Sequence, residues 1–165
     1  MKQGWQTLAE RLRSEISEYG QLLSLFEEQQ RLILRNAPES VLEASHGIEA
    51  QVQILNQQRR LREEAVAGFA LDHGQPATAT LRSLLVFLPT EARPLFQALI
   101  TEINCLIHRV RRDSGRNHRL LQCVVECHQE VLRRLRPDAF TKTYARNGRV
   151  SLAAVRPVPA IEIAG

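Results

Sequence analysis

The segment spanning residues 90–136 constrains the fold of this chain more than any other. Its apolar residues recur at alternating intervals of four and three, which is the spacing of one face of an α-helix. A helix of 47 residues would be about 70 Å long at about 1.5 Å per residue, and it needs other helices to cover its apolar side. The face has two apolar stretches, Leu99, Ile103, Leu106 and Val110 followed by Leu120, Val124, Cys127 and Val131. Asp113 and Asn117 lie between them, so we expect the middle of this helix to be hydrated, bent or occupied by another group.

The composition favours an all-α protein. Of the 165 residues, 44% are hydrophobic but only 5% are aromatic, and Leu, Arg, Gln, Glu and Ala dominate. This length fits one domain. No apolar run approaches the roughly 20 residues that a membrane-spanning helix needs, and the N-terminus leads into an amphipathic pattern rather than a signal sequence. We therefore expect a cytoplasmic protein without direct membrane insertion.

Three further helices are predicted before the long one, at residues 3–36, 38–71 and 80–88. The connection at Pro38 is short, which places the first two helices antiparallel. Gly74 is expected to cap the second helix at its C-terminus. The apolar stripe of this second helix is interrupted by Arg59 and Arg62, which predicts weak packing there. The expected fold is an elongated antiparallel bundle of three long coiled-coil-like helices plus one short helix, spanning residues 1–137.

Residues 138–165 lack helical or strand periodicity over a useful length. Pro137 ends the long helix, and further prolines and glycines punctuate the remaining segment. We expect this second region to be a flexible C-terminal tail, extended or disordered. Phe140 and Tyr144 are unusual residues for an inert linker, and they lie close to Lys142 and Arg146. Together they predict a small amphipathic, basic anchor that orders itself on a partner.

The sequence does not predict an enzyme, a metal site or a cofactor. It contains no glycine-rich phosphate loop, no paired-histidine zinc helix and no serine elbow, and its five histidines are scattered. Cys123 and Cys127 lie one helical turn apart, but Cys105 would lie about 27 Å from Cys123 along the same helix. A zinc ion would lack ligands there. We expect the three cysteines to be reduced and buried, as free cysteines commonly are.

Positive charge is concentrated on the long helix. Its basic stripe has spacings of three, four and three and consists of Arg109, Arg112, Arg116 and Arg119. Such stripes can track phosphates. However, the second helix is net negative, the sequence contains no recognisable DNA-binding module, and eight aromatic residues are few for stacking on single strands. Pairing within the molecule or solvation therefore explains the stripe better, and no nucleic-acid partner is expected.

The order of several short motifs resembles the flagellar export chaperones of the FlgN type, from the N-terminus to Ser151. The motifs are Trp5; Tyr19, Leu23, Phe26 and Glu27; Leu81 to Leu85 with Leu88 and Pro89; Asn117 with Leu120 and Leu121; and Thr143 to Gly148. Leucine spacing of this kind is common on helices. The ordered combination, with a tyrosine followed four residues later by Gly148, makes the resemblance specific. The stretch from Asp113 to Arg116 departs from the family, which is richer in asparagine and glutamine there.

The resemblance implies a cytoplasmic type III export chaperone that binds hook-filament junction proteins through their C-terminal helical segments. It would prevent their premature assembly or aggregation and deliver them to the cytoplasmic domain of the export gate. We expect the cargo-binding positions to be among Leu99, Ile103, Leu106, Val110, Leu120, Val124 and Val131, although these residues are equally suited to a core. The resemblance assigns gate docking to Phe140, Tyr144 and Gly148. The alternative is a structural coiled-coil adaptor or self-associating bundle without chaperone activity.

Overall fold

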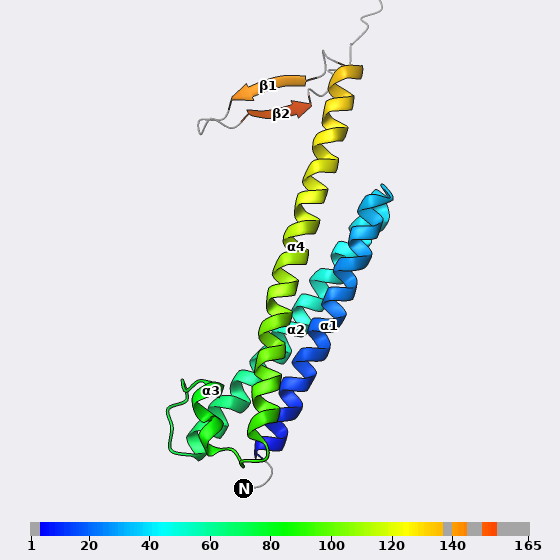
Figure 1. Ribbon diagram of the computed structural model, residues 1–165. Helices are drawn as coiled ribbons and strands as arrows, with labels where there is room; N and C mark the ends of the chain where they lie inside the picture. The colour runs from blue at the N-terminus through cyan, green and yellow to red at the C-terminus, as the bar shows by residue number, and fades with distance from the viewer. Residues whose placement is uncertain (1–3, 137–139, 145–149, 155–165) are drawn as a thin grey trace, which may run out of the picture. The chain divides into compact units, whose positions relative to one another are not determined.

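The computed structural model describes residues 4–136 and the backbone of residues 140–144 and 150–154. The elements in order are α1 (Gly4–Leu34), α2 (Pro38–Asp72), α3 (Leu81–Leu84), the 3-10 turn η1 (Leu85–Phe87), α4 (Arg93–Leu135), β1 (Phe140–Tyr144) and β2 (Val150–Ala154) (Figure 1). The predicted all-α fold class is confirmed, with all three long helices in place. Among the described helices, none combines the length and apolar content that crossing a bilayer requires.

Helices α1 and α2 form an antiparallel hairpin and are the most closely packed pair of helices (Figure 1). Asn36 adopts a left-handed backbone with φ of 53° after the end of α1. The next amide, that of Ala37, donates to the Leu32 carbonyl at 3.2 Å, which closes the C-terminus of the helix. Pro38 then begins α2, where its missing N–H costs nothing. The short connection thus gives the antiparallel arrangement that the sequence predicts.

The core of the first unit, Met1–Leu120, is built from apolar side chains of all three long helices. α1 buries an apolar stripe with the helical spacing of three and four. Its buried members are Ala9, Leu12, Tyr19, Leu23, Phe26 and Ile33, and Leu8 and Leu22 widen the stripe. α2 contributes Leu55, Val66, Phe69 and Ala70, and α4 contributes Phe96, Ile103 and Leu106. A stripe this broad allows α1 to contact two helices at once.

An ion pair joins α1 to α2 where the sequence predicts weak packing. Arg62 Nε lies 2.7 Å from Glu15 Oε2, and the side chains are 22% and 1% exposed, respectively. The surrounding segment, residues 57–64, contains no buried side chain, in agreement with the predicted weak packing, and Arg62 adds an ion pair to a buried carboxylate on the facing helix. Arg59 is exposed and pairs with Glu63 on its own helix.

The predicted short helix at 80–88 divides into α3 and η1. The Thr80 hydroxyl accepts from the Ser83 amide at 3.2 Å and caps α3. Leu84 and Leu88 are buried, so both turns are anchored in the core. Arg93, at the start of α4, donates to the carbonyl oxygens of Leu88 and Val86 at 3.1 and 2.8 Å. This short segment therefore fixes where α4 begins.

The second unit, Leu121–Gly165, contains the last turns of α4 and a β-hairpin. β1 and β2 pair antiparallel, with Phe140 opposite Ala154 and Tyr144 opposite Val150. The sequence predicts an extended or disordered tail. The described strands are extended, but the sequence does not predict their pairing. The predicted division into a 1–137 bundle and a 138–165 tail stays a prediction, and the contacts of the chain divide it at Leu120 instead.

Candidate functional site

The structure places the first apolar stretch of α4 in the core. Ile103 and Leu106 are buried, and Leu99 and Val110 pack against the same cluster. Their partners are apolar side chains of the α1–α2 hairpin and of the α3 segment. In this conformation the chain itself covers these four positions, so they hold α4 in place.

Asn117 joins α4 to the hairpin through a polar layer that crosses three helices. It is only 3% exposed. Its Nδ2 donates to the Phe26 carbonyl at 2.8 Å and to Gln29 Oε1 at 3.0 Å. Gln29 Nε2 in turn donates to Ser45 Oγ on α2 at 3.0 Å. Of the three expectations for the middle of the long helix, occupation by another group therefore describes Asn117, and α4 continues through this point as one helix.

The second apolar stretch of α4 is far less covered. Leu120 and Val124 are partly buried, whereas Val131 is 54% exposed. Three further apolar side chains of the same helix are also exposed: Val125 at 50%, Leu132 at 51% and Leu135 at 73%. We call Leu121, Val124, Val125, Val131, Leu132 and Leu135 the distal stripe. Their spacings of three, four and seven place them on one side of the helix.

A polar flank with two thiols borders the distal stripe. An open hollow there is lined by Cys123, Glu126, Cys127, Glu130, Val131 and Arg134. Glu130 pairs with Arg133 and Arg134. The neighbouring Cys127 thiol raises the pKa of Cys123, which lowers its thiolate fraction.

All three cysteines are exposed, so the prediction that they are buried is wrong. The alternating spacing places Cys127 beside Val124 and Val131, but that helical face lacks a covering partner in the described chain. Within the described residues, no group of three metal-binding side chains comes together.

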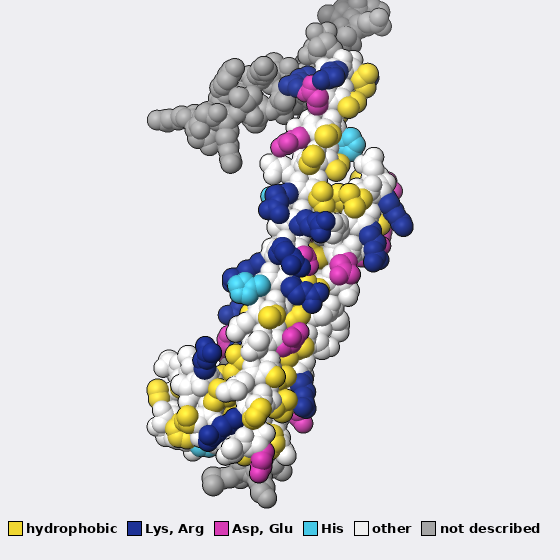
Figure 2. All heavy atoms as spheres, viewed as in Figure 1, with side chains coloured by type: hydrophobic (Ala, Val, Ile, Leu, Met, Phe, Trp, Pro, Cys, Tyr) yellow, Lys and Arg dark blue, Asp and Glu magenta, His cyan; other side chains and the backbone are white. Residues whose placement is uncertain are grey.

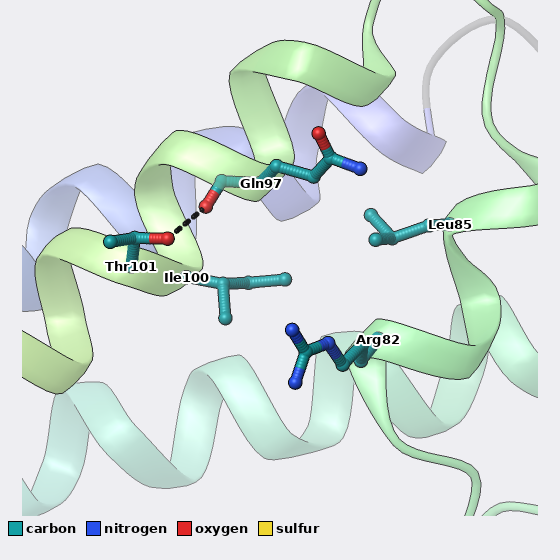
Figure 3. Close-up of a pocket in the computed structure, with 5 residues that line it drawn as sticks. All are labelled: Arg82, Leu85, Gln97, Ile100 and Thr101. Atoms are coloured by element: carbon teal, nitrogen blue, oxygen red, sulfur yellow. Dashed lines mark hydrogen bonds between the residues drawn. The ribbon is translucent and has the colours of Figure 1, made fainter.

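A separate pocket of about 280 Å³ lies between the α3 segment and α4. Figure 3 shows the Arg82 guanidinium group extending toward Ile100, with Leu85 and Gln97 on the other side of the opening. The hydroxyl of Thr101 donates to the Gln97 carbonyl of its own helix at 2.9 Å. The lining combines one guanidinium group with amide, hydroxyl and aliphatic side chains.

The predicted gate-docking residues lie in the second unit. Phe140 and Tyr144 are the first and last residues of β1. Gly148 lies outside the described residues. A strand therefore carries the two aromatic residues of the predicted anchor.

A family comparison decides the identity of the chain. The model of the family described as FlgN protein matches residues 1–151 of the 165. The chain belongs to the FlgN family. This match spans the hairpin, α4 and both aromatic residues of the β1 anchor, so the FlgN relationship covers the candidate surfaces described above. Among curated proteins and solved structures, none matches the chain.

FlgN proteins are flagellar export chaperones, and the chain shares this general role. The family functions in protein export and flagellum biogenesis, and its members bind flagellar export substrates. In this FlgN chain, the sequence pattern does not single out Val125, Leu132 and Leu135 as exposed positions. The pattern gave no signal because it describes which residues share a face, not which faces a partner covers.

Proposed function

We propose that this chain is a cytoplasmic chaperone that binds the C-terminal helical segments of hook-filament junction proteins before export. Binding keeps these segments from assembling or aggregating early, and the chaperone then delivers them to the export gate. The observation that carries the proposal is the distal stripe, whose exposed side chains supply the apolar face that a cargo helix needs. Exposed apolar rows of this kind mark interaction sites.

An amphipathic cargo helix fits this stripe chemically. Segments that form coiled coils only on assembly present apolar heptads while they are still monomeric, and they are prone to aggregate. Packing such a helix against Val124, Val131 and their neighbours would follow ordinary knobs-into-holes geometry. The polar flank at Glu126 and Glu130 could then pair with basic residues on the rim of the cargo helix.

The exposed apolar area of the distal stripe predicts a moderate affinity for cargo. Fully burying a Val or Leu side chain is worth roughly 1.5–3 kcal/mol, so covering four half-exposed ones contributes about 4 kcal/mol. Association costs at least about 4 kcal/mol in lost freedom. Contacts from the flank and from the partly buried members of the stripe must therefore supply the net affinity. A micromolar complex suits a chaperone that has to release its cargo.

The test replaces Val124 and Val131 together with aspartate. We expect loss of binding to a junction-protein C-terminal segment by isothermal titration calorimetry, with helicity by circular dichroism retained. The matched control replaces Leu42 and Ile54 with aspartate, because these α2 residues are also exposed but lie outside the stripe. Lost helicity in the Val124/Val131 variant would instead show that these residues hold the bundle together.

The same experiment separates the chaperone from a self-associating adaptor. An adaptor would form dimers without cargo, and the aspartate variant would convert them to monomers in sedimentation experiments. A chaperone forms a one-to-one complex with the cargo segment under the same conditions. Dimers that persist in the presence of excess cargo would favour the adaptor.

A further inference from the structure

The basic stripe of α4 is a solvent-facing surface. Between Glu102 and Glu126, α4 carries five arginines and a single acidic residue, Asp113. At 3.6 residues per turn, five of the basic side chains in this segment fall within about 100° of the helix circumference. They form what we call the basic face: His108, Arg109, Arg112, Arg116 and Arg119. All five are exposed. Figure 2 shows basic side chains gathered over the middle of the molecule, with a histidine among them.

Of the two expectations for the stripe, solvation describes it better than pairing within the molecule, which leaves most of this charge exposed. Arg112 contacts Asp113 at 3.1 Å, yet its side chain remains 69% exposed. With the Gln30 amide turned so that its oxygen faces α4, that oxygen accepts from Arg116 Nε at 3.2 Å and from Nη2 at 3.3 Å, which gives Arg116 a neutral partner. Within the described residues, no ion pair joins any arginine of the basic face to α2.

The chemistry of the basic face restricts its partner. Protein interfaces rely on buried aromatic or apolar anchors, and the five residues of the basic face include no Leu, Ile, Val, Phe, Tyr or Trp. Single-stranded nucleic acids need stacking platforms, and residues 108–119 include no Phe, Tyr or Trp. An anionic lipid surface needs neither, because its potential attracts each basic side chain that comes within about a Debye length of roughly 10 Å.

We propose that the basic face docks on an anionic membrane surface, peripherally and without insertion. The proposal rests on the proposed delivery role and extends it, since an export gate embedded in a membrane is surrounded by anionic headgroups. Arginines near such a surface contribute about fivefold in affinity each, equivalent to about 1 kcal/mol, and they act additively. The basic face would therefore concentrate the chaperone where its cargo is needed, with strong dependence on salt.

The test uses the full chain and vesicles of phosphatidylcholine with or without phosphatidylglycerol. We expect cosedimentation only with the anionic vesicles, weakened by added salt. The double variant Arg112→Glu with Arg119→Glu should bind about tenfold or more weakly, because both side chains lie on the outward side of the face.

The matched control is Arg13→Glu with Arg60→Glu, which changes the net charge equally at exposed positions on α1 and α2. Its vesicle binding should remain near that of the natural chain. Equal losses in both double variants, or no vesicle binding by the natural chain, would overturn the proposal. Salt-sensitive binding to single-stranded RNA without vesicle binding would overturn it in favour of nucleic acid.

Cargo affinity measured on the same proteins keeps the two proposals separate. The Arg112/Arg119 variant should bind the junction-protein segment as well as the natural chain does. Vesicle binding without any cargo binding would leave the basic face intact and contradict the proposed chaperone substrate. Cargo binding without vesicle binding would contradict membrane docking and leave the proposed chaperone function intact.

Discussion

Asn117 occupies a position where the spacing of α4 would favour a leucine, and its amide instead connects three helices. Asn117 Nδ2 donates to Gln29 Oε1, and Gln29 Nε2 donates to the Ser45 hydroxyl on α2. A buried polar contact of this kind tolerates only one axial alignment, because a shift by one turn would leave the amides without partners. We infer that this layer sets the register of α4 against the hairpin.

Replacing Asn117 with leucine should therefore lower the free energy of unfolding by about 1–3 kcal/mol, because Gln29 Oε1 would lose its donor. The double replacement Asn117→Leu with Gln29→Leu should cost less than the sum of the single changes. We expect a coupling of about 0.5–3 kcal/mol in urea unfolding. Asn104→Leu, at an exposed site of the same helix, is the control and should change little. Additive costs for Asn117 and Gln29 would contradict the register role.

Glu15 is a second buried polar residue, and it lies where α1 packs against α2. Burial raises the pKa of its carboxyl above the ordinary value of 4.5, more than the Arg62 and Arg59 guanidinium groups lower it. The folded chain therefore keeps this proton to a higher pH than the unfolded chain does. Its contribution to stability is largest below the unfolded-state pKa and is lost as pH rises through the folded-state pKa.

We expect the natural chain to gain stability relative to Glu15→Gln as the pH falls from neutral toward 4.5. Residue 15 cannot titrate in the variant, so the difference isolates this carboxyl from all other groups. Thermal unfolding of both proteins across this range measures it. A difference that stays constant would show that the ion pair with Arg62 balances the cost of burial, and a reversed slope would show that it outweighs that cost.

At the residue scale, the sequence predicts most of the apolar core but not the polar layer. The stripe of α1 could be identified from its spacing, because each apolar side chain lowers the free energy of folding wherever it is buried. Glu15 and Gln29 become buried only because Arg62, Asn117 and Ser45 reach them from other helices. Nothing in a single helical pattern indicates such partners.

At the scale of single elements, the ends of helices follow local chemistry and were largely predictable. Gly74 has φ of 68° just beyond α2. The Gln75 amide donates to the Ala70 carbonyl at 2.9 Å, which is the closing bond of a Schellman motif. The sequence identifies Gly74 as this cap. It does not predict the division of residues 80–88 into α3 and η1, which depends on how Leu84 and Leu88 enter the core.

Two glycine-to-alanine changes should therefore have opposite effects on stability. Gly74→Ala places a Cβ in a left-handed conformation and should cost about 1–2 kcal/mol. Gly20 lies inside α1 with open space where a Cβ would stand, so Gly20→Ala should add about 0.5–1 kcal/mol through helix propensity alone. Urea unfolding of the two variants compares them directly. A destabilised Gly20→Ala chain would mean that close packing at this site limits α1.

For the molecule as a whole, the two apolar stretches of α4 have the same spacing but different surroundings. The sequence shows both and cannot rank them, because the pattern is identical whether the covering helix belongs to this chain or to a partner. The structure covers Ile103 and Leu106 and leaves Val131 and Leu135 exposed. Under the proposed function, the first stretch holds the fold together and the second binds cargo.

Delivery of cargo to the export gate requires a docking surface besides the two apolar stretches of α4. The resemblance to the FlgN family assigns this role to β1. Phe140 and Tyr144 begin and end this strand, with Lys142 between them. A tyrosine ring gains a large contact area at low entropic cost, and its hydroxyl adds a polar contact, so such residues dominate many interfaces. Because the distal stripe lies on α4, cargo binding and gate binding should be separable by mutation.

We expect Tyr144→Ala to abolish binding to the cytoplasmic domain of the export gate while cargo affinity stays nearly unchanged. Calorimetric titration with each partner measures both, and Tm reports on the fold. Thr143→Ala, the neighbouring change in the same strand, is the control and should retain gate binding. Tyr144→Phe keeps the ring and removes the hydroxyl, so partial binding would assign the main contribution to the ring. Unaltered gate binding by Tyr144→Ala, or a Tm lowered by many degrees, would contradict a docking role and favour a structural one.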